Sequence, residues 1–187
     1  MILNHYTTEK SAQNIAKKGF CCEEKRAFEK QNSYDEFWDS YCGNLRNGKE
    51  ALHIDNAHFF ILENDSFFED IAGVNAKVSV DSKLLDITKL YVANMLHATR
   101  LYRAVQQRDI ILVNLIKRQY WKDFIEFDYF VRNKSQINEI CKRKYGMPYI
   151  AEILYFGDIK PEQLKIENYE LKKIEDKCNK ILIQFKV

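Results

Sequence analysis

The chain has 187 residues, of which 46% are hydrophobic, 13% aromatic and 30% charged. This length predicts a single domain, residues 1–187, with enough apolar side chains for one sizeable core. The formal net charge is only +2, which argues against a general nucleic-acid-binding protein because such a protein is usually far more basic. A small net charge is compatible with a local basic surface.

The cysteines show no pattern of a metal site or a disulfide framework. They are Cys21, Cys22, Cys42, Cys141 and Cys178. Their number is odd and no Cys-x-x-Cys spacing occurs, so we expect neither an obligatory disulfide nor a metal ligand. We interpret Cys21 and Cys22 as two half-buried thiols that follow a helix.

The sequence predicts no membrane association. It contains no apolar run long enough to span a bilayer, and the N-terminus turns polar within its first five residues. We therefore expect a cytoplasmic protein where it is made. Export by a route other than the general secretory pathway would leave no recognisable signal.

The N-terminal residues predict a strand, a tight turn and a short helix. Residues 2–6 form the strand, and Thr7 or Thr8 is a suitable N-cap. Apolar residues at helical spacing follow at 12–16, and Gly19 lies where a helix often ends with a positive φ.

The next part of the chain predicts alternating short helices and strands. A helix is expected at about 34–41, and the apolar run 58–62 indicates a buried strand. Asn64 or Asp65 can cap a short helix that reaches residue 73. Residues 76–80 alternate between apolar and polar side chains, as in a half-buried strand.

Residues 89–141 lack glycine and proline, and their apolar residues recur at roughly helical spacing from Leu90 onwards. We predict two or three helices that break near Asp109 and Asn133. A basic edge accompanies them. It consists of Arg100, Arg103, Arg108, Lys117, Arg118 and Lys122. Such an edge is usually a solvated helix face, and a phosphate contact by Arg100 or Arg103 is the alternative.

The C-terminal part predicts a return to strands. Gly146 ends the helical region, residues 149–156 form a strong strand, and residues 159–166 return toward the sheet after a turn. A last strand is expected at 180–187. Short strands near both termini with a helical block between them predict an α+β fold.

Three separated segments carry the functional signal. They are Asn4-His5-Tyr6-Thr7-Thr8 with the later Gly19-Phe20, Ala57-His58-Phe59-Phe60 with Asp70-Ile71-Ala72, and Ala151-Glu152-Ile153-Leu154-Tyr155 with Asp158-Ile159-Lys160-Pro161-Glu162. A histidine, an aromatic ring and a glutamate on three strands can form one nucleotide pocket, and the order of the segments is informative.

In this order the segments resemble the motif strands of the ADP-ribosyltransferase fold, especially the class with a His-Tyr-Glu triad. In that family a first strand ends in His-Gly-Thr, a second carries an aromatic motif, and a later one begins with the catalytic glutamate. The resemblance implies a split, mostly antiparallel sheet of the ADP-ribosyltransferase type, with a helical insertion at about 89–147.

The resemblance also implies an activity. A mono-ADP-ribosyltransferase uses NAD as its substrate, modifies a macromolecular acceptor, either a protein or a nucleic acid, and releases nicotinamide. Glu152 is the implied catalytic residue, because a carboxylate near the ribose stabilises the positive charge that forms there. The implied NAD-binding residues are His5, Tyr6, Thr7, Phe59 and Phe60.

Two positions depart from the family pattern. Tyr6 stands where the family has a glycine, and the second-motif tyrosine is a phenylalanine here. The larger side chain narrows the approach to nicotinamide, and the phenylalanine keeps a stacking ring without its hydroxyl. Both changes favour a mono-transferase, or a diverged toxin or effector, over a polymerase.

Other interpretations remain open from the sequence alone. His5 is compatible with a structural histidine, and Phe59 and Phe60 with core residues. RNA 2′-phosphotransferases share the architecture but use arginine-rich sites, which Glu152 and the near-neutral charge disfavour. The main alternative is a non-catalytic α+β interaction protein with a degenerate NAD pocket, which NAD binding or turnover would distinguish.

Overall fold

The computed structural model describes residues 1–22, 46–47, 50–51, 57–62 and 74–168. Three predicted elements lie outside these residues. They are the helix at 34–41, the short helix that ends at 73, and the strand at 180–187.

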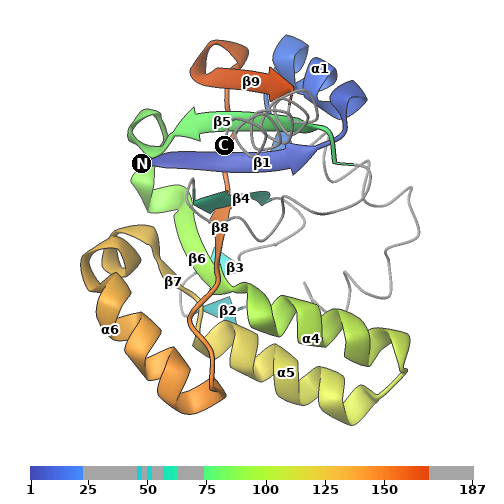
Figure 1. Cartoon of the computed structure of the whole chain (residues 1–187), viewed down its shortest axis with the longest axis vertical. Helices are drawn as coiled ribbons and strands as arrows, with labels where there is room; N and C mark the ends of the chain where they lie inside the picture. The colour runs from blue at the N-terminus through green and yellow to red at the C-terminus, as the bar shows by residue number, and fades with distance from the viewer. Residues whose placement is uncertain (23–45, 48–49, 52–56, 63–73, 169–187) are drawn as a thin grey trace, which may run out of the picture.

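Among the described residues, seven strands form one antiparallel sheet in the order β7-β6-β8-β4-β1-β5-β9 (Figure 1). The strands are β1 (Ile2–Thr7), β4 (His58–Leu62), β5 (Ala76–Asp81), β6 (Leu90–Asn94), β7 (Ile125–Glu126), β8 (Ala151–Tyr155) and β9 (Leu164–Asn168). A separate small ribbon pairs β2 (Arg46–Asn47) with β3 (Glu50–Ala51). The predicted α+β class and antiparallel pairing are confirmed, and the seven strands form one sheet.

The ladder between β1 and β4 is short. It pairs Leu3 with Leu62 and Asn4 with Ile61, whereas β1 pairs with β5 along its whole length, from Ile2 to Thr7. The sheet therefore consists of two well-paired parts, β7-β6-β8-β4 and β1-β5-β9, that meet at a narrow junction. The motif strands lie on both sides of this junction.

The first helix, α1 (Glu9–Lys18), begins and ends at the predicted residues. The Thr8 side chain accepts a hydrogen bond from the backbone N–H of Ser11, and Gly19 follows the helix with φ of 77°. The basic Lys17 and Lys18 lie in the last turn, where they complement the helix dipole. The helix packs against β5 and β9.

Three further helices lie between β6 and β8. They are α4 (Met95–Gln106), α5 (Ile110–Lys122) and α6 (Phe127–Tyr145). Asp109 accepts a hydrogen bond from Leu112 N–H and caps α5, so the predicted break near Asp109 is confirmed. Asn133 has non-helical angles but only kinks α6, and the second break falls instead between α5 and α6.

The prediction of a helical block at about 89–147 was wrong where two strands interrupt it, at its start and at β7. Leu90–Asn94 forms β6, between β7 and β8. The run includes Tyr91 and Val92, whose side chains favour strands. The apolar positions in so short a run fit both the repeat of a helix and the repeat of a strand. Burial on both faces removed the alternation that would have revealed a strand.

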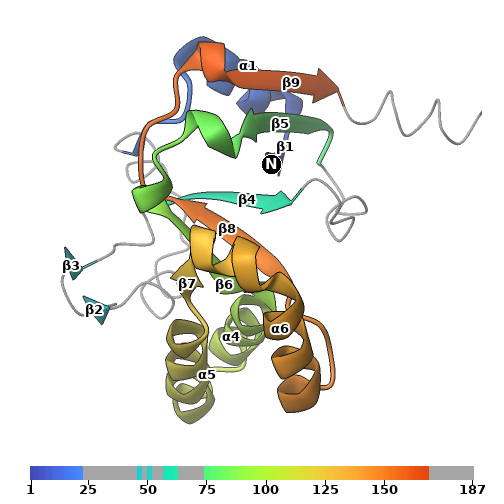
Figure 2. The same ribbon diagram turned by 90° about the vertical axis from the view of Figure 1, so that its left-hand side faces the viewer.

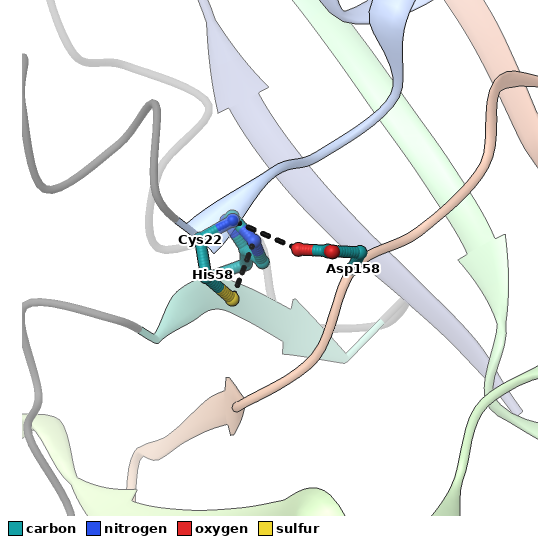
Figure 3. A group of neighbouring side chains, drawn as sticks. All are labelled: Cys22, His58 and Asp158. Atoms are coloured by element: carbon teal, nitrogen blue, oxygen red, sulfur yellow. Dashed lines mark hydrogen bonds between the residues drawn. The ribbon is translucent and has the colours of Figure 1, made fainter.

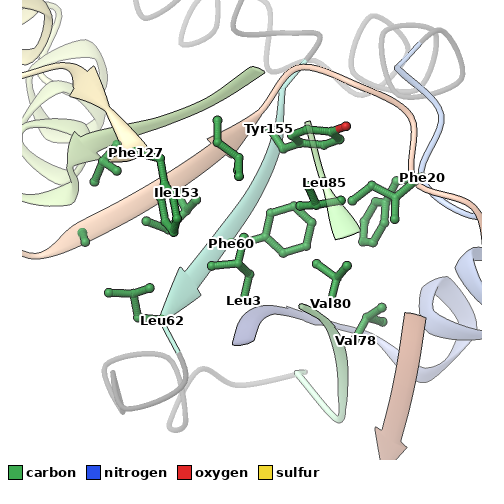
Figure 4. Close-up of a cluster of buried hydrophobic side chains, with 14 of the residues drawn as sticks. Leu3, Phe20, Phe60, Leu62, Val78, Val80, Leu85, Phe127, Ile153 and Tyr155 are labelled. Atoms are coloured by element: carbon green, nitrogen blue, oxygen red, sulfur yellow. The ribbon is translucent and has the colours of Figure 1, made fainter. Parts of the chain in front are cut away.

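Two apolar clusters cover the two faces of the sheet. The larger one contains Leu3, Phe60, Val78 and Ile153 with residues of α1 and α6 (Figure 4). The smaller one lies under α4 and α5 and contains Ala93, Leu101, Tyr120 and Leu154. Figures 1 and 2 show α4 and α5 together at the end of the molecule opposite β9 and α1.

In the part of the chain that the structure describes, no helix has the length and apolar character needed to cross a membrane.

Candidate active site

The three motif strands are neighbours in the sheet. β4 lies between β1 and β8, so segments that are distant in the sequence lie side by side (Figure 1). Phe59 pairs with Leu154, and Phe60 pairs with Ile153. Leu3 of β1 and Ile153 of β8 are both fully buried in the same cluster. We therefore find that the strands at 2–7 and 151–155 share one core, as the resemblance requires.

The alternation of side chains along the strands separates the motif residues onto two faces. His5 and Thr7 lie opposite Val78 and Ala76, which belong to the larger cluster. We call this side, which carries His5, Thr7, His58 and Phe60, the histidine face. Glu152 lies opposite Ala93 of the smaller cluster. We call this side, which carries Asn4, Tyr6, Phe59 and Glu152, the glutamate face.

His5 is held within an aromatic group on the histidine face. Its Nδ1 lies 2.9 Å from the carbonyl oxygen of Phe59, and since a carbonyl only accepts, Nδ1 carries the donated proton. Its ring lies edge-on to Phe20 and Phe60, at centroid distances of 5.2 and 6.0 Å. Phe60 is only 1% exposed. His5 therefore links β1 to the main chain of β4.

Two further motif segments, Gly19-Phe20 and the turn after β8, meet beside this aromatic group. Phe20 N–H donates to Ile159 O at 2.8 Å, and Ile159 N–H donates to Phe20 O at 2.9 Å. The approach depends on Gly19, since a Cβ there would overlap the carbonyl oxygen of Ile159. The Gly-Phe pair after α1 thus forms a bridge with the turn after β8.

Glu152 is buried on the glutamate face, where its side chain is 8% exposed. The hydroxyl of Tyr120, a fully buried residue of α5, donates to Glu152 Oε2 at 3.2 Å. Burial of a carboxylate is costly unless donors compensate it. The helical block therefore contributes directly to the surroundings of the motif glutamate, which the sequence did not indicate.

A polar groove of about 310 Å³ lies on the glutamate face of β1, β5 and β9. Its polar lining includes Asn4, Lys77, Ser79, Lys165 and Glu167. Ser79 Oγ donates to Asn4 Oδ1 at 2.8 Å. Lys165 and Lys77 bind the Glu167 carboxylate at 2.8 and 2.7 Å, and these hydrogen bonds lower the pKa of Glu167 to about 2.

The groove and the motif glutamate are close along the sheet. Asn4 pairs with Ile61, and the β4–β8 register continued by one residue places Ile61 beside Glu152. Two strand spacings separate β1 from β8, which corresponds to about 10 Å. A ligand the size of a dinucleotide is long enough to reach from the groove to the glutamate.

Three of the six predicted site residues, Tyr6, Phe59 and Glu152, lie on the glutamate face of neighbouring strands. The other three, His5, Thr7 and Phe60, lie on the opposite face of the same strands, so the expectation that His5 and Glu152 face one pocket was wrong. The groove residues Asn4 and Ser79 were missed, although the polar residues Lys77, Ser79 and Asp81 at every second position of β5 are a sequence signal for a polar face.

The basic edge lies away from the groove. Arg100, Arg103 and Arg108 are exposed on α4 and its C-terminal turn, which Figures 1 and 2 show at the end of the molecule opposite β9. A contact between Arg100 or Arg103 and a pyrophosphate in this groove is therefore not supported. The edge instead forms a separate surface on the α4–α5 pair.

A second polar cluster connects the helices. His97 Nε2 donates to Asp123 Oδ2 at 2.9 Å, and Tyr145 OH donates to the same oxygen at 2.8 Å. Burial raises the pKa of Asp123, but these hydrogen bonds and Lys144 outweigh it, so the net pKa is lowered. The cluster joins α4, α6 and the C-terminal end of α5, and we assign it a structural role.

Comparisons with family models, with curated proteins and with solved structures find no match to this chain.

Proposed function

We propose that this protein is a mono-ADP-ribosyltransferase that transfers ADP-ribose from NAD to a macromolecular acceptor, a protein or a nucleic acid, and releases nicotinamide. The sheet is proposed to be of the ADP-ribosyltransferase type. The observation that carries the proposal is the neighbouring order of β8, β4 and β1, with the buried Glu152 facing the same side as Tyr6 and Phe59.

The position of Glu152 supports a role in the chemical step. Cleavage of the bond between nicotinamide and ribose leaves positive charge on the sugar, and a nearby carboxylate stabilises that charge. Glu152 is 8% exposed, so solvent screens its charge only weakly. Nicotinamide then leaves with the bonding electrons, and the acceptor nucleophile bonds to the ribose and loses its proton.

The glutamate face supports a mode of NAD binding. The half-buried ring of Phe59 is proposed to stack on nicotinamide, and the groove lined by Lys77 and Lys165 is proposed to receive the adenosine half. Tyr6 lies on this face at the position of the family's glycine, where its ring narrows the site. A narrow site favours transfer of one ADP-ribose unit.

His5 has a different role in this proposal from the one implied by the resemblance. Its Nδ1 is bonded to the carbonyl oxygen of Phe59, so it positions the strand that presents the Phe59 ring. His5 is therefore a positioning residue, and Glu152 is the catalytic one.

The basic edge supports an acidic acceptor. Residues 95–122 contain six arginines and lysines but only one acid, Asp109, whereas the whole chain has a net charge of +2. A surface of this kind attracts nucleic acid or an acidic protein face. The choice between these acceptors is an outcome of the experiment below.

The experiment is incubation of the full chain with cell extract and NAD labelled in its adenosine half. The expected result is free nicotinamide together with label on a macromolecule. Treatment with protease or nuclease then identifies the acceptor class. If neither nicotinamide nor labelled product forms, the non-catalytic interaction protein becomes the better account.

A further inference from the structure

A cysteine, a histidine and an aspartate converge beside the histidine face (Figure 3). They are Cys22 after α1, His58 at the start of β4, and Asp158 in the turn after β8. His58 and Asp158 lie 36 and 136 residues from Cys22 along the chain, so no spacing motif reveals them. Their potential ligand atoms all lie within 4.8 Å of one another.

The fold holds these three residues in place. The bridge between Phe20 and Ile159 aligns the segments that carry Cys22 and Asp158, and Cys22 N–H donates to Asp158 Oδ1 at 2.9 Å. The ring of Phe20 lies 4.9 Å from that of His58, which is 3% exposed. The donor atoms are therefore arranged by the folded chain before any ion binds.

We propose that Cys22, His58 and Asp158 form a binding site for a zinc-like divalent cation. Cys22 Sγ lies 3.5 Å from His58 Nε2, and bond lengths of about 2.3 Å to sulfur and 2.0 Å to nitrogen at a tetrahedral angle separate two such ligands by about 3.5 Å. The observed separation thus already matches a shared tetrahedral ion.

The donor set selects the class of metal. Thiolate and imidazole ligands suit zinc and similar transition metals, whereas magnesium and calcium require oxygen ligands. A Cys22 thiolate and the Asp158 carboxylate together balance the charge of a divalent ion. Binding breaks the S–H bond of Cys22, forms a metal–sulfur bond and releases one proton to solvent.

Three protein ligands leave one tetrahedral position for water or a substrate atom, as in catalytic rather than structural zinc sites. Asp158 is exposed, so solvent reaches the site from the side of this ligand. The site lies on the side opposite Glu152 and is independent of the proposed NAD chemistry. It also differs from the expectation that the chain has no metal ligand, which rested on spacing alone.

The test is titration of the metal-free full chain with Co²⁺, which reports on thiolate ligation through its near-ultraviolet charge-transfer band. We expect a band that saturates at one ion per chain and disappears when Zn²⁺ is added. Cys22→Ser should abolish the band, and Asp158→Asn should weaken binding by about 100-fold or more, since loss of an outer-shell partner alone costs about 10–100-fold.

The matched control is Cys21→Ser, which removes the adjacent thiol and should leave the band and the affinity unchanged. Circular dichroism verifies that each variant is folded, and the exposed position of Asp158 keeps that variant informative if Cys22→Ser is unstable. The proposal is overturned if the wild type shows no stoichiometric band, if the band survives in folded Cys22→Ser, or if Cys21→Ser removes it.

Discussion

The two faces of the sheet at β4 each carry a titratable motif residue, and the surroundings of these two residues differ. On the histidine face, His5 is bonded to a main-chain carbonyl and enclosed by Phe20 and Phe60. On the glutamate face, Glu152 is buried against Tyr120 and lies on the same side as a polar groove. The same three strands thus carry a structural histidine on one side and a candidate chemical group on the other.

The difference teaches that strand order and side-chain direction are separate pieces of information. A motif such as His-Tyr-Thr fixes which strand is involved, whereas a shift of one residue moves every side chain to the other face. The histidine face packs into the core, whereas the proposed catalysis belongs to the glutamate face, so substitutions on each face should separate stability from activity.

The largest effect on stability is expected from Gly19→Ala on the histidine side. Gly19 has φ of 77°, and a Cβ would overlap the backbone of Ile159. We expect a loss of about 3 kcal/mol or more in the free energy of unfolding, because strain and loss of the Phe20–Ile159 bridge combine. Urea unfolding measures it.

Gly146→Ala is the matched control for this prediction. Gly146 has a similar φ of 74°, but a Cβ there would meet no atom within 4 Å. Its cost should be limited to backbone strain, about 1 kcal/mol. Equal losses in the two variants would show that the contact with Ile159 does not stabilise the fold.

A smaller effect, on both rate and stability, is expected from Tyr120→Phe on the glutamate face. The variant removes the hydroxyl that donates to Glu152 Oε2, which should cost about 1 kcal/mol of stability. We also expect roughly tenfold slower release of nicotinamide, because the carboxylate loses a group that orients it. Steady-state kinetics with NAD measures the rate.

Tyr145→Phe provides the comparison for Tyr120→Phe. It removes a hydroxyl that donates to Asp123 instead, so it should reduce stability by a similar amount and leave the rate of nicotinamide release unchanged. A fall in rate that is the same in both variants would contradict a specific link between Tyr120 and Glu152.

The smallest effect is expected from Glu167→Gln in the groove, and it depends on pH. Lys165 and Lys77 lower the pKa of Glu167 from 4.5 to about 2, so the carboxylate stabilises the fold above about pH 4.5 and this contribution is lost as the pH falls toward 2. The stability difference between wild type and variant should shrink over this window.

Acid titration of the unfolding midpoint measures this difference, with Glu126→Gln on the exposed edge strand β7 as the control. Glu126→Gln reports the effect of removing an exposed carboxylate. If Glu167→Gln behaves in the same way, the ion pairs with Lys77 and Lys165 contribute nothing to folding.

Much of the fold followed from local patterns. The capping residues Thr8 and Asp109 and the apolar run at 58–62 located their elements, because caps and periodicity are local properties. The strand at Leu90–Asn94 was missed because burial on both faces gives it no alternation.

The candidate site was only partly predictable. The sequence indicated that β1, β4 and β8 belong together, but it did not contain the register that places His5 and Glu152 on opposite faces. It also gave no indication of Tyr120, which lies 32 residues before Glu152 and donates to it from α5. Contacts of this kind depend on tertiary packing, which local patterns do not encode.

The most direct test of the central claim is nicotinamide release from NAD by Glu152→Gln, compared with the wild type and with Glu126→Gln. The substitution keeps the shape of the side chain but removes the charge that stabilises the transition state. We expect a fall in rate on the order of 10²-fold or more, with NAD affinity and fold retained. Release at the wild-type rate by a folded Glu152→Gln variant would contradict the assignment of Glu152 as the catalytic residue.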